Sequence, residues 1–136
     1  MAPAAFDIHG KIIFVTGAGR GIGKGIAQVM AEAGADVAIN ALTETYVGPL
    51  ASELAEETGR TVAPVIADVT KPDGAKHAII EVLSKFGRID VLVNALGDSI
   101  RTPLVGLPNG ENAGMLVSDE ELDFVIDINL TEALLC

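Results

Sequence analysis

Cysteine and aromatic residues are nearly absent from this chain. The single cysteine, Cys136, is the last residue, which excludes a disulfide framework and a cysteine-based zinc site within the 136 residues. Tryptophan is missing and tyrosine occurs once, as Tyr46. An enzyme class that uses a tyrosine as its acid or base therefore has one candidate residue in this sequence.

Basic residues are also scarce: 9 lysines and arginines stand against 19 aspartates and glutamates, a formal net charge of −10. A surface this acidic repels the phosphates of nucleic acid, so we expect no nucleic-acid partner. We interpret the acidic residues as a solvated face and expect no metal site. The N-terminus lacks a basic region followed by an apolar run, and no stretch approaches the roughly 20 apolar residues of a membrane helix. We therefore expect a soluble cytoplasmic protein.

Strand-like and helix-like patterns alternate along the chain, of which 49% is apolar. Runs rich in valine and isoleucine predict strands at residues 11–16, 36–40, 61–67 and 89–94. Amphipathic helical patterns follow each of them. This alternation predicts an α/β fold, a doubly wound parallel sheet of the Rossmann type with about four strands and four helices, in one domain over residues 1–136.

Several residues predict where the helices begin and end. Gly34 and Gly59 are expected to end the first and second helices, and Thr70 to cap the third, with Pro72 in its first turn. Residues 118–121 form a capping box that begins a fourth helix running to the last residue. The apolar stripe expected to face the sheet from the first helix consists of Ile22, Ile26, Val29, Met30 and Ala33.

The expected sheet has one strand suited to an edge and one that is not. Pro64 removes a ladder hydrogen bond from the third strand, which predicts a place at or near a sheet edge. The fourth strand is too apolar for an open edge, and residues 134–136 end inside a helical pattern without a stop signal. We therefore expect the chain to be the N-terminal part of a longer domain.

A glycine-rich segment, residues 16–23, connects the first strand to the first helix. Its glycines suit a tight turn, close backbone approach to a pyrophosphate, and tight packing of helix on strand. The following helix directs free N–H groups and a positive dipole end at the phosphates. The segment therefore predicts dinucleotide binding by Gly17, Arg20, Gly21, Ile22 and Gly23.

The pattern Thr-Gly-x-x-x-Gly-Ile-Gly in this segment resembles the cofactor loop of the short-chain dehydrogenase/reductase family, which includes 3-oxoacyl-carrier-protein reductases. Asp68 and Val69, after the third strand, resemble the family's adenine contact. Asn94, Ala95 and Gly97 lie in a segment that resembles the one lining the ribose. The resemblance implies an NAD(P)-dependent oxidoreductase that interconverts a secondary alcohol and a ketone on a small-molecule substrate, and a homo-oligomer when the protein is full length.

Asn129 lies in a segment, residues 127–130, that resembles the family's helix with a catalytic asparagine. Independently of the family, Asn129 interrupts an apolar stripe, and a buried amide needs a hydrogen-bond partner. We therefore expect it to be buried and partnered, either as a catalytic residue or as a packing amide. The stripe around it consists of Leu122, Val125, Ile126, Leu130, Ala133 and Leu134.

The family's chemistry also uses a serine and a tyrosine followed four residues later by a lysine. Tyr46 is followed at that distance by Leu50, so we expect Tyr46 to be structural or solvent-facing. The catalytic serine, tyrosine and lysine are expected beyond Cys136, and the 136-residue chain alone is not expected to catalyse hydride transfer. A non-catalytic dinucleotide-binding module remains the alternative. Leu96 replaces the family's usual alanine, and the polar segment 98–117 either shapes substrate choice or is an insertion.

The end of the second strand bears on which nicotinamide cofactor is preferred. NAD(H) selectivity normally needs a carboxylate there, and residues 40–42 are Asn-Ala-Leu. This absence also disfavours a methyltransferase, whose second strand usually ends in an acid. Arg20 offers a charge-assisted contact to a 2′-phosphate. We therefore favour NADP(H), with NAD(H) as the alternative.

Overall fold

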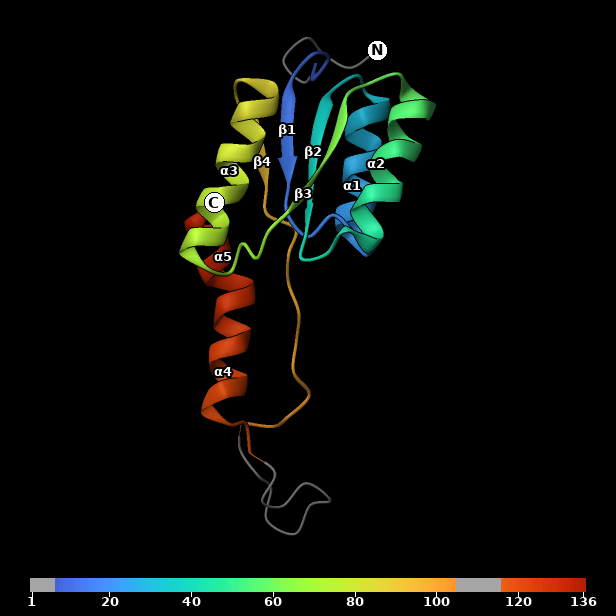
Figure 1. Cartoon of the computed structure of the whole chain (residues 1–136). Helices are drawn as coiled ribbons and strands as arrows, with labels where there is room; N and C mark the ends of the chain where they lie inside the picture. Colours follow the sequence, from blue (N-terminus) through green and yellow to red (C-terminus); the bar gives the residue numbers. More distant parts are fainter. Residues whose placement is uncertain (1–6, 105–115) are drawn as a thin grey trace.

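A four-stranded parallel sheet forms the centre of the computed structural model, which describes residues 7–104 and 116–136. The strands lie in the order β3-β2-β1-β4, as Figure 1 shows. They are β1 (Ile12–Val15), β2 (Asp36–Ala41), β3 (Val62–Ile66) and β4 (Val91–Val93). The predicted α/β fold with its parallel sheet is confirmed.

Helices lie on both faces of the sheet. On one face are α1 (Gly21–Glu32) and α2 (Glu44–Thr58), and on the other are α3 (Pro72–Phe86) and the short α5 (Glu132–Leu135) (Figure 1). The side chains of β1 alternate between these two layers, because successive residues of a strand point to opposite faces. Ile13 and Val15 pack in the cluster of α1 and α2, while Phe14 packs in the cluster of α3.

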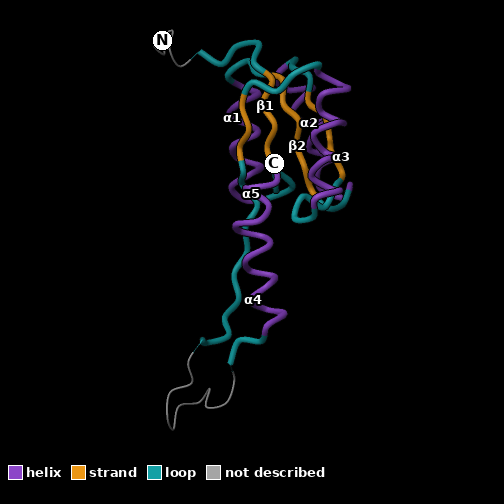
Figure 2. Tube along the Cα trace, turned by 90° about the vertical axis from the view of Figure 1, so that its left-hand side faces the viewer, coloured by secondary structure: helices purple, strands orange, loops and turns teal. Residues whose placement is uncertain are grey.

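The last helical region continues from α4 (Asp119–Ile126) through a π-helical segment (Asp127–Thr131) into α5. Figures 1 and 2 show α4 projecting beyond the carboxyl ends of the strands. The predicted capping box is present: Glu121 N–H donates to Ser118 Oγ at 3.2 Å, and Ser118 N–H donates to Glu121 Oε2 at 3.0 Å. The fourth helix therefore begins where the sequence predicts.

The free edge of β3 carries Pro64, as predicted. Next to it, the buried side chain of Asn40 in β2 adds hydrogen bonds between β2 and β3 to those of the backbone. Its Nδ2 donates to the carbonyl oxygens of Val65 and Ala67, each at 3.1 Å. Asn40 is 1% exposed, so its amide replaces the water that would otherwise solvate those carbonyl groups.

The stripe predicted for α1 is only partly right: Ile26 and Met30 pack against the core, but the helix turns a neighbouring face to the sheet. Its buried residues are Gly23, Ala27 and Ala31, whereas Ile22 and Val29 are 80% and 60% exposed. The cause is the glycine-rich loop, against which Gly23 packs too closely for any side chain. The helix therefore lies on the sheet through its small residues.

The expected cap of the third helix is wrong. Lys71, not Thr70, is the N-cap of α3, because the Thr70 hydroxyl donates to Asp68 Oδ1 at 2.6 Å instead. The apolar stripe of the last helical region is largely exposed: Leu130 is 55% and Leu134 is 76% exposed. The side turned inward carries Glu132, which is buried. The stops at Gly34 and Gly59 and Pro72 at the start of α3 are as predicted.

Replacing Asn40 with leucine, a side chain of similar size, should lower the free energy of unfolding by about 1–3 kcal/mol, because one buried and one partly buried carbonyl group lose their donor. Urea denaturation followed by circular dichroism measures the change. The control is Ser52→Ala on the exposed face of α2, which should change the stability by less than about 0.5 kcal/mol. An unchanged unfolding midpoint for Asn40→Leu would contradict the role assigned to this amide.

Candidate functional site

Two glycines give the loop between β1 and α1 its shape. Gly21 has a φ of +57°, and a Cβ added to it would meet nothing within 4 Å. At Gly23, an added Cβ would lie 2.4 Å from the carbonyl oxygen of Gly17. Gly21 therefore makes the turn and leaves one side of the loop open, while Gly23 allows α1 to approach the loop closely.

The open side of this loop borders a cavity of about 360 Å³, which we call the loop pocket. Arg20 precedes α1 without capping it through its side chain, so the first N–H groups of the helix remain available to an anion. Most of the predicted cofactor-binding residues line this pocket. The lining consists of Gly17, Arg20, Gly21, Ile22, Gly23, Ala95, Leu96, Gly97, Asp98 and Ile128.

A second cavity of about 530 Å³, which we call the β3 pocket, lies at the carboxyl end of β3. Leu96 and Ile128 line both pockets, so the two cavities adjoin across these side chains. Asp68 contributes a carboxylate whose Oδ1 accepts from the N–H and the hydroxyl of Thr70, at 3.1 and 2.6 Å. Its Oδ2 is thus the oxygen left for a ligand. Val69 also lines the pocket, but its side chain is 1% exposed and packs in the core.

An ion pair joins the loop after β3 to the π segment beside this pocket. Lys71 Nζ lies 2.5 Å from Asp127 Oδ2. The hydrogen bond and the opposite charge raise the pKa of Lys71 and lower the pKa of Asp127, so both groups stay charged around neutral pH. Both side chains are partly exposed, so the pair positions the pocket wall more than it stabilises the fold.

The segment after β4 is attached to the end of β1 by Thr16. The Thr16 N–H donates to the carbonyl oxygen of Val93 at 3.0 Å, and the Ala95 N–H donates to Thr16 Oγ1 at 3.1 Å. These bonds bring residues 95–97 to the glycine-rich loop. An added Cβ on Gly17 would lie only 2.7 Å from the Cα of Leu96, which shows how close the two segments are. Asn94, also predicted to bind a cofactor, is exposed and lines neither pocket.

Asn129 joins the last helical region to the same segment. Its Nδ2 donates to the carbonyl oxygens of Asp98 and Val125, at 2.8 and 2.9 Å. An added Cβ on Gly97 would lie 2.9 Å from Asn129 Oδ1, so the amide also lies against Gly97. The predicted hydrogen-bond partner exists, but the predicted burial is wrong because Asn129 is exposed. It lies in the π segment, a rare helix form that is frequent at functional sites.

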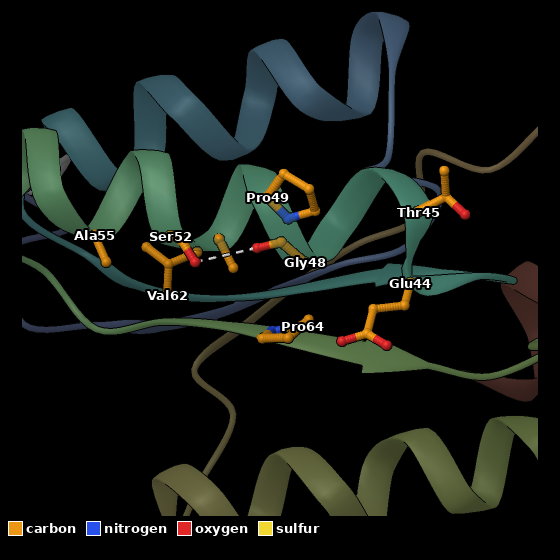
Figure 3. A pocket seen from close by; sticks show the side chains of 9 residues that line it. Glu44, Thr45, Gly48, Pro49, Ser52, Ala55, Val62 and Pro64 are labelled. Atoms are coloured by element: carbon orange, nitrogen blue, oxygen red, sulfur yellow. Dashed lines mark hydrogen bonds between the residues drawn. The ribbon is translucent and has the colours of Figure 1, made fainter.

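A larger cavity than either of these, about 800 Å³, lies away from these residues between α2 and β3 (Figure 3). Figure 3 shows Glu44 and Pro64 on its lower side and the Ser52 hydroxyl donating to the Gly48 carbonyl oxygen above them. It is an open groove with one charged side chain, Glu44, and it includes no residue of the glycine-rich loop. Size alone therefore does not make it the functional site.

Sequence reasoning missed several residues of the β3 pocket. Lys71 carries no sequence signal, because its partner Asp127 lies 56 residues away. Ile128 follows Asp127 in the segment that resembles the family's helix, and this was the available signal for it. Leu42 and Phe124 complete the apolar wall of the β3 pocket. Tyr46, in contrast, is 59% exposed, as expected for a residue without a catalytic role.

Metal and membrane features are absent from the part of the chain that the structure describes. In residues 7–104 and 116–136, no group of three or more histidine, cysteine, aspartate or glutamate side chains is placed to hold a metal ion. None of the helices in those ranges is both long enough and apolar enough to cross a membrane.

Comparison with known proteins agrees with this geometry. The family model described as short chain dehydrogenase matches residues 11–136. A 3-oxoacyl-[acyl-carrier-protein] reductase from Staphylococcus epidermidis is 36% identical over 126 residues, which cover 93% of this chain and 48% of that protein. The chain spans less than half the length of the curated relatives it matches.

Solved structures of reductases are also similar to this chain. L-sorbose reductase from Gluconobacter frateurii, complexed with NADPH and L-sorbose, superposes with a TM-score of 0.82 and 30% identity, over 93% of this chain and 44% of that one. A 3-ketoacyl-(acyl-carrier-protein) reductase from Brucella melitensis, complexed with NADH, gives a TM-score of 0.75 and 32% identity, over 94% and 47%. With a family match that begins at the first strand and continues through the last helix, the chain belongs to the short-chain dehydrogenase family.

Proposed function

We propose that residues 1–136 form the N-terminal, dinucleotide-binding part of an NAD(P)-dependent oxidoreductase that interconverts a secondary alcohol and a ketone. The observation that carries the proposal is the pair of adjoining pockets, one at the uncapped end of α1 and one at the carboxyl end of β3. Family membership and solved relatives that are complexed with NADPH or NADH support it.

The residues fit the two ends of a dinucleotide. The open space over Gly21 and the free N–H groups of α1 suit a pyrophosphate. The β3 pocket offers Asp68 Oδ2 to an exocyclic amine and the apolar Leu42 and Phe124 to a ring. Gly97 lines the loop pocket and lies against the Asn129 amide, and we propose this side of the pocket as the nicotinamide end.

Bound nicotinamide supplies or accepts the hydride in such a reaction, and the residues of this chain position it. Gly97 has no side chain between the loop pocket and the Asn129 amide. Asn129 holds the Asp98 carbonyl group and fixes the segment after β4, which borders the space for a small carbonyl or alcohol substrate. We propose Asn129 as a catalytic residue, and a non-catalytic dinucleotide-binding module is the alternative if turnover is absent.

We further propose that the cofactor is NADP(H). The Arg20 side chain lines the loop pocket and makes no ion pair with any residue in the described part of the chain. No carboxylate ends β2: Asn40 is buried in its hydrogen bonds to β3, and Ala41 is small. The site therefore has a cation for a 2′-phosphate and no fixed acid at the end of β2 to repel it.

Replacing Gly21 with alanine should weaken the binding of NADP(H) and NAD(H) by at least about tenfold, because the methyl group enters the loop pocket and the positive φ is strained. Isothermal titration calorimetry measures the affinities. Gly25→Ala is the matched control: Gly25 lies one turn further along α1 in open space, so the change should preserve binding and stabilise the helix by roughly 0.5–1 kcal/mol. Wild-type affinity for Gly21→Ala would refute the proposed site.

Arg20→Ala should lower the affinity for NADP(H) by about tenfold or more and leave NAD(H) affinity unchanged, because a charge-assisted bond to the 2′-phosphate is lost. Lys24→Ala removes the same charge one turn along α1 and should change neither affinity. Titration of each variant with both cofactors decides the point. Equal binding of NAD(H) and NADP(H) by the wild type, or unchanged NADP(H) affinity in Arg20→Ala, would overturn the preference.

Asn129→Ala should reduce the kcat of the intact oxidoreductase by about 100-fold while changing the cofactor Kd little, since its amide acts on the reacting end and not on the β3 pocket. Steady-state kinetics with a panel of ketones and a cofactor titration separate the two effects. A variant with wild-type kcat would remove Asn129 from the catalytic residues.

A further inference from the structure

The backbone of Lys71 is fixed at the start of α3. As the N-cap of this helix, Lys71 accepts a hydrogen bond at its carbonyl oxygen from the Ala75 N–H, at 2.9 Å. Its own N–H donates to the carbonyl oxygen of Asp68, at 3.3 Å. A Cβ added to Gly74 would overlap that same carbonyl oxygen, so α3 begins directly against the turn at Asp68. Lys71 therefore has a defined position relative to the end of β3.

The side chain of Lys71 attaches the last helical region to this position. Its Nζ lies 2.5 Å from Oδ2 of Asp127, the first residue of the π segment. Neither α4 nor the π segment, which both belong to the described part of the chain, contains a buried residue. Within the described residues, this pair is the one hydrogen bond or ion pair between residues 118–131 and residues 7–94.

Three consecutive residues of the π segment make three different contacts. Side chains two residues apart on a helix point away from each other. Asp127 accordingly reaches the loop after β3, while Asn129 reaches the carbonyl oxygen of Asp98 after β4, at 2.8 Å. Ile128, between them, lines both pockets. The π segment is thus attached on two sides, at the place where the two pockets adjoin.

Lys71 also offsets the negative charge on the two walls of the β3 pocket. Asp68 belongs to the wall after β3, whereas Glu120, Asp123 and Asp127 belong to the wall formed by α4 and the π segment. Among the described residues that line this pocket, Lys71 is the one cation. Like charges across a cavity repel each other, less strongly in salt, so the loss of Lys71 would force the two walls apart.

We propose that Lys71 is a positioning residue for the reacting end of the site, which holds the π segment through Asp127 in the orientation that places Asn129 against Gly97. A helix attached at one point can turn about it, and a second attachment on its other side fixes its orientation. Lys71 lines the β3 pocket and not the loop pocket, so it acts through the π segment and not on the reacting atoms. The inference rests on the proposed function, because it concerns Asn129 as a catalytic residue.

Replacing Lys71 with methionine keeps the length of the side chain and removes its charge. In the intact oxidoreductase we expect kcat to fall by about fivefold, as for the loss of a partly exposed ion pair, and the Kd of NADP⁺ to change by less than about twofold. Lys71→Arg keeps the pair and should preserve kcat. Lys76→Met removes the same charge on the exposed side of α3 and should change neither constant. Raising the ionic strength should narrow the difference between wild type and Lys71→Met.

A double-mutant cycle identifies the residue through which Lys71 acts. Because the proposed effect passes through Asn129, adding Lys71→Met to Asn129→Ala should lower kcat by less than about twofold further. An undiminished loss in that background would mean that Lys71 acts independently of Asn129 and would overturn the proposal. Weaker NADP⁺ binding by Lys71→Met with unchanged kcat would also overturn it, since Lys71 would then be a cofactor contact.

Hydrogen exchange tests the attachment without turnover. Lys71→Met should raise the exchange rate of the backbone amides in residues 124–131 by about fivefold and leave β1 and β2 unchanged, because only the attachment of the π segment is weakened. Asp127→Asn breaks the same pair and should have the same effect. Equal exchange in wild type and both variants would refute the role of Lys71. If no ketone is turned over and no dinucleotide binds, the proposed function fails, and the exchange rates still decide whether the pair holds the π segment.

Discussion

The close contact between Gly23 and the Gly17 carbonyl group determines much of the rest of the structure. Because no side chain fits between them, α1 begins directly against the glycine-rich loop and its first N–H groups face the loop pocket. The same contact sets which face of α1 meets the sheet, so that alanines are buried and Ile22 is exposed. The orientation of α1 and the opening of the loop pocket thus both depend on the close approach of Gly23 to the Gly17 carbonyl group.

Charge is distributed unevenly over the site, although the chain as a whole carries −10. The loop pocket combines Arg20 with the positive end of α1, which suits phosphate groups. The acidic residues Glu120 and Asp123 instead line the β3 pocket, where we propose that the uncharged adenine ring binds. Lys71 does not add to the cationic side, because Asp127 pairs with it. An acidic protein can therefore offer a local anion site while it repels polyanions elsewhere.

The sequence alone predicts features that depend on short stretches of chain. Strand positions, the edge strand with Pro64, the glycine stops and the capping box at Ser118 all follow from local patterns and agree with the structure. Most residues predicted for the cofactor also line one of the two pockets.

Features that depend on tertiary contacts were not predictable. The buried face of α1 follows from its contact with the glycine-rich loop, and the spacing of apolar residues along the helix does not reveal this contact. The Lys71–Asp127 pair joins residues far apart in the sequence, and the burial of Glu132 depends on how the last helical region packs. The pattern around Asn129 suggested a buried amide, yet its hydrogen bonds to the Asp98 and Val125 carbonyl groups hold it in an exposed position.

Pro64 also makes the two edges of the sheet chemically different. Thr61 and Ala67 are bonded to β2, and since these groups alternate along a parallel strand, residue 64 directs its backbone to the free side. The row of donors on that side is therefore interrupted at its middle, and an incoming strand cannot pair along its full length. β4, the other edge strand, has no proline, so a missing N–H does not interrupt its outer side. The two edges therefore differ in their capacity to pair with a further strand, because residue 64 lacks an N–H.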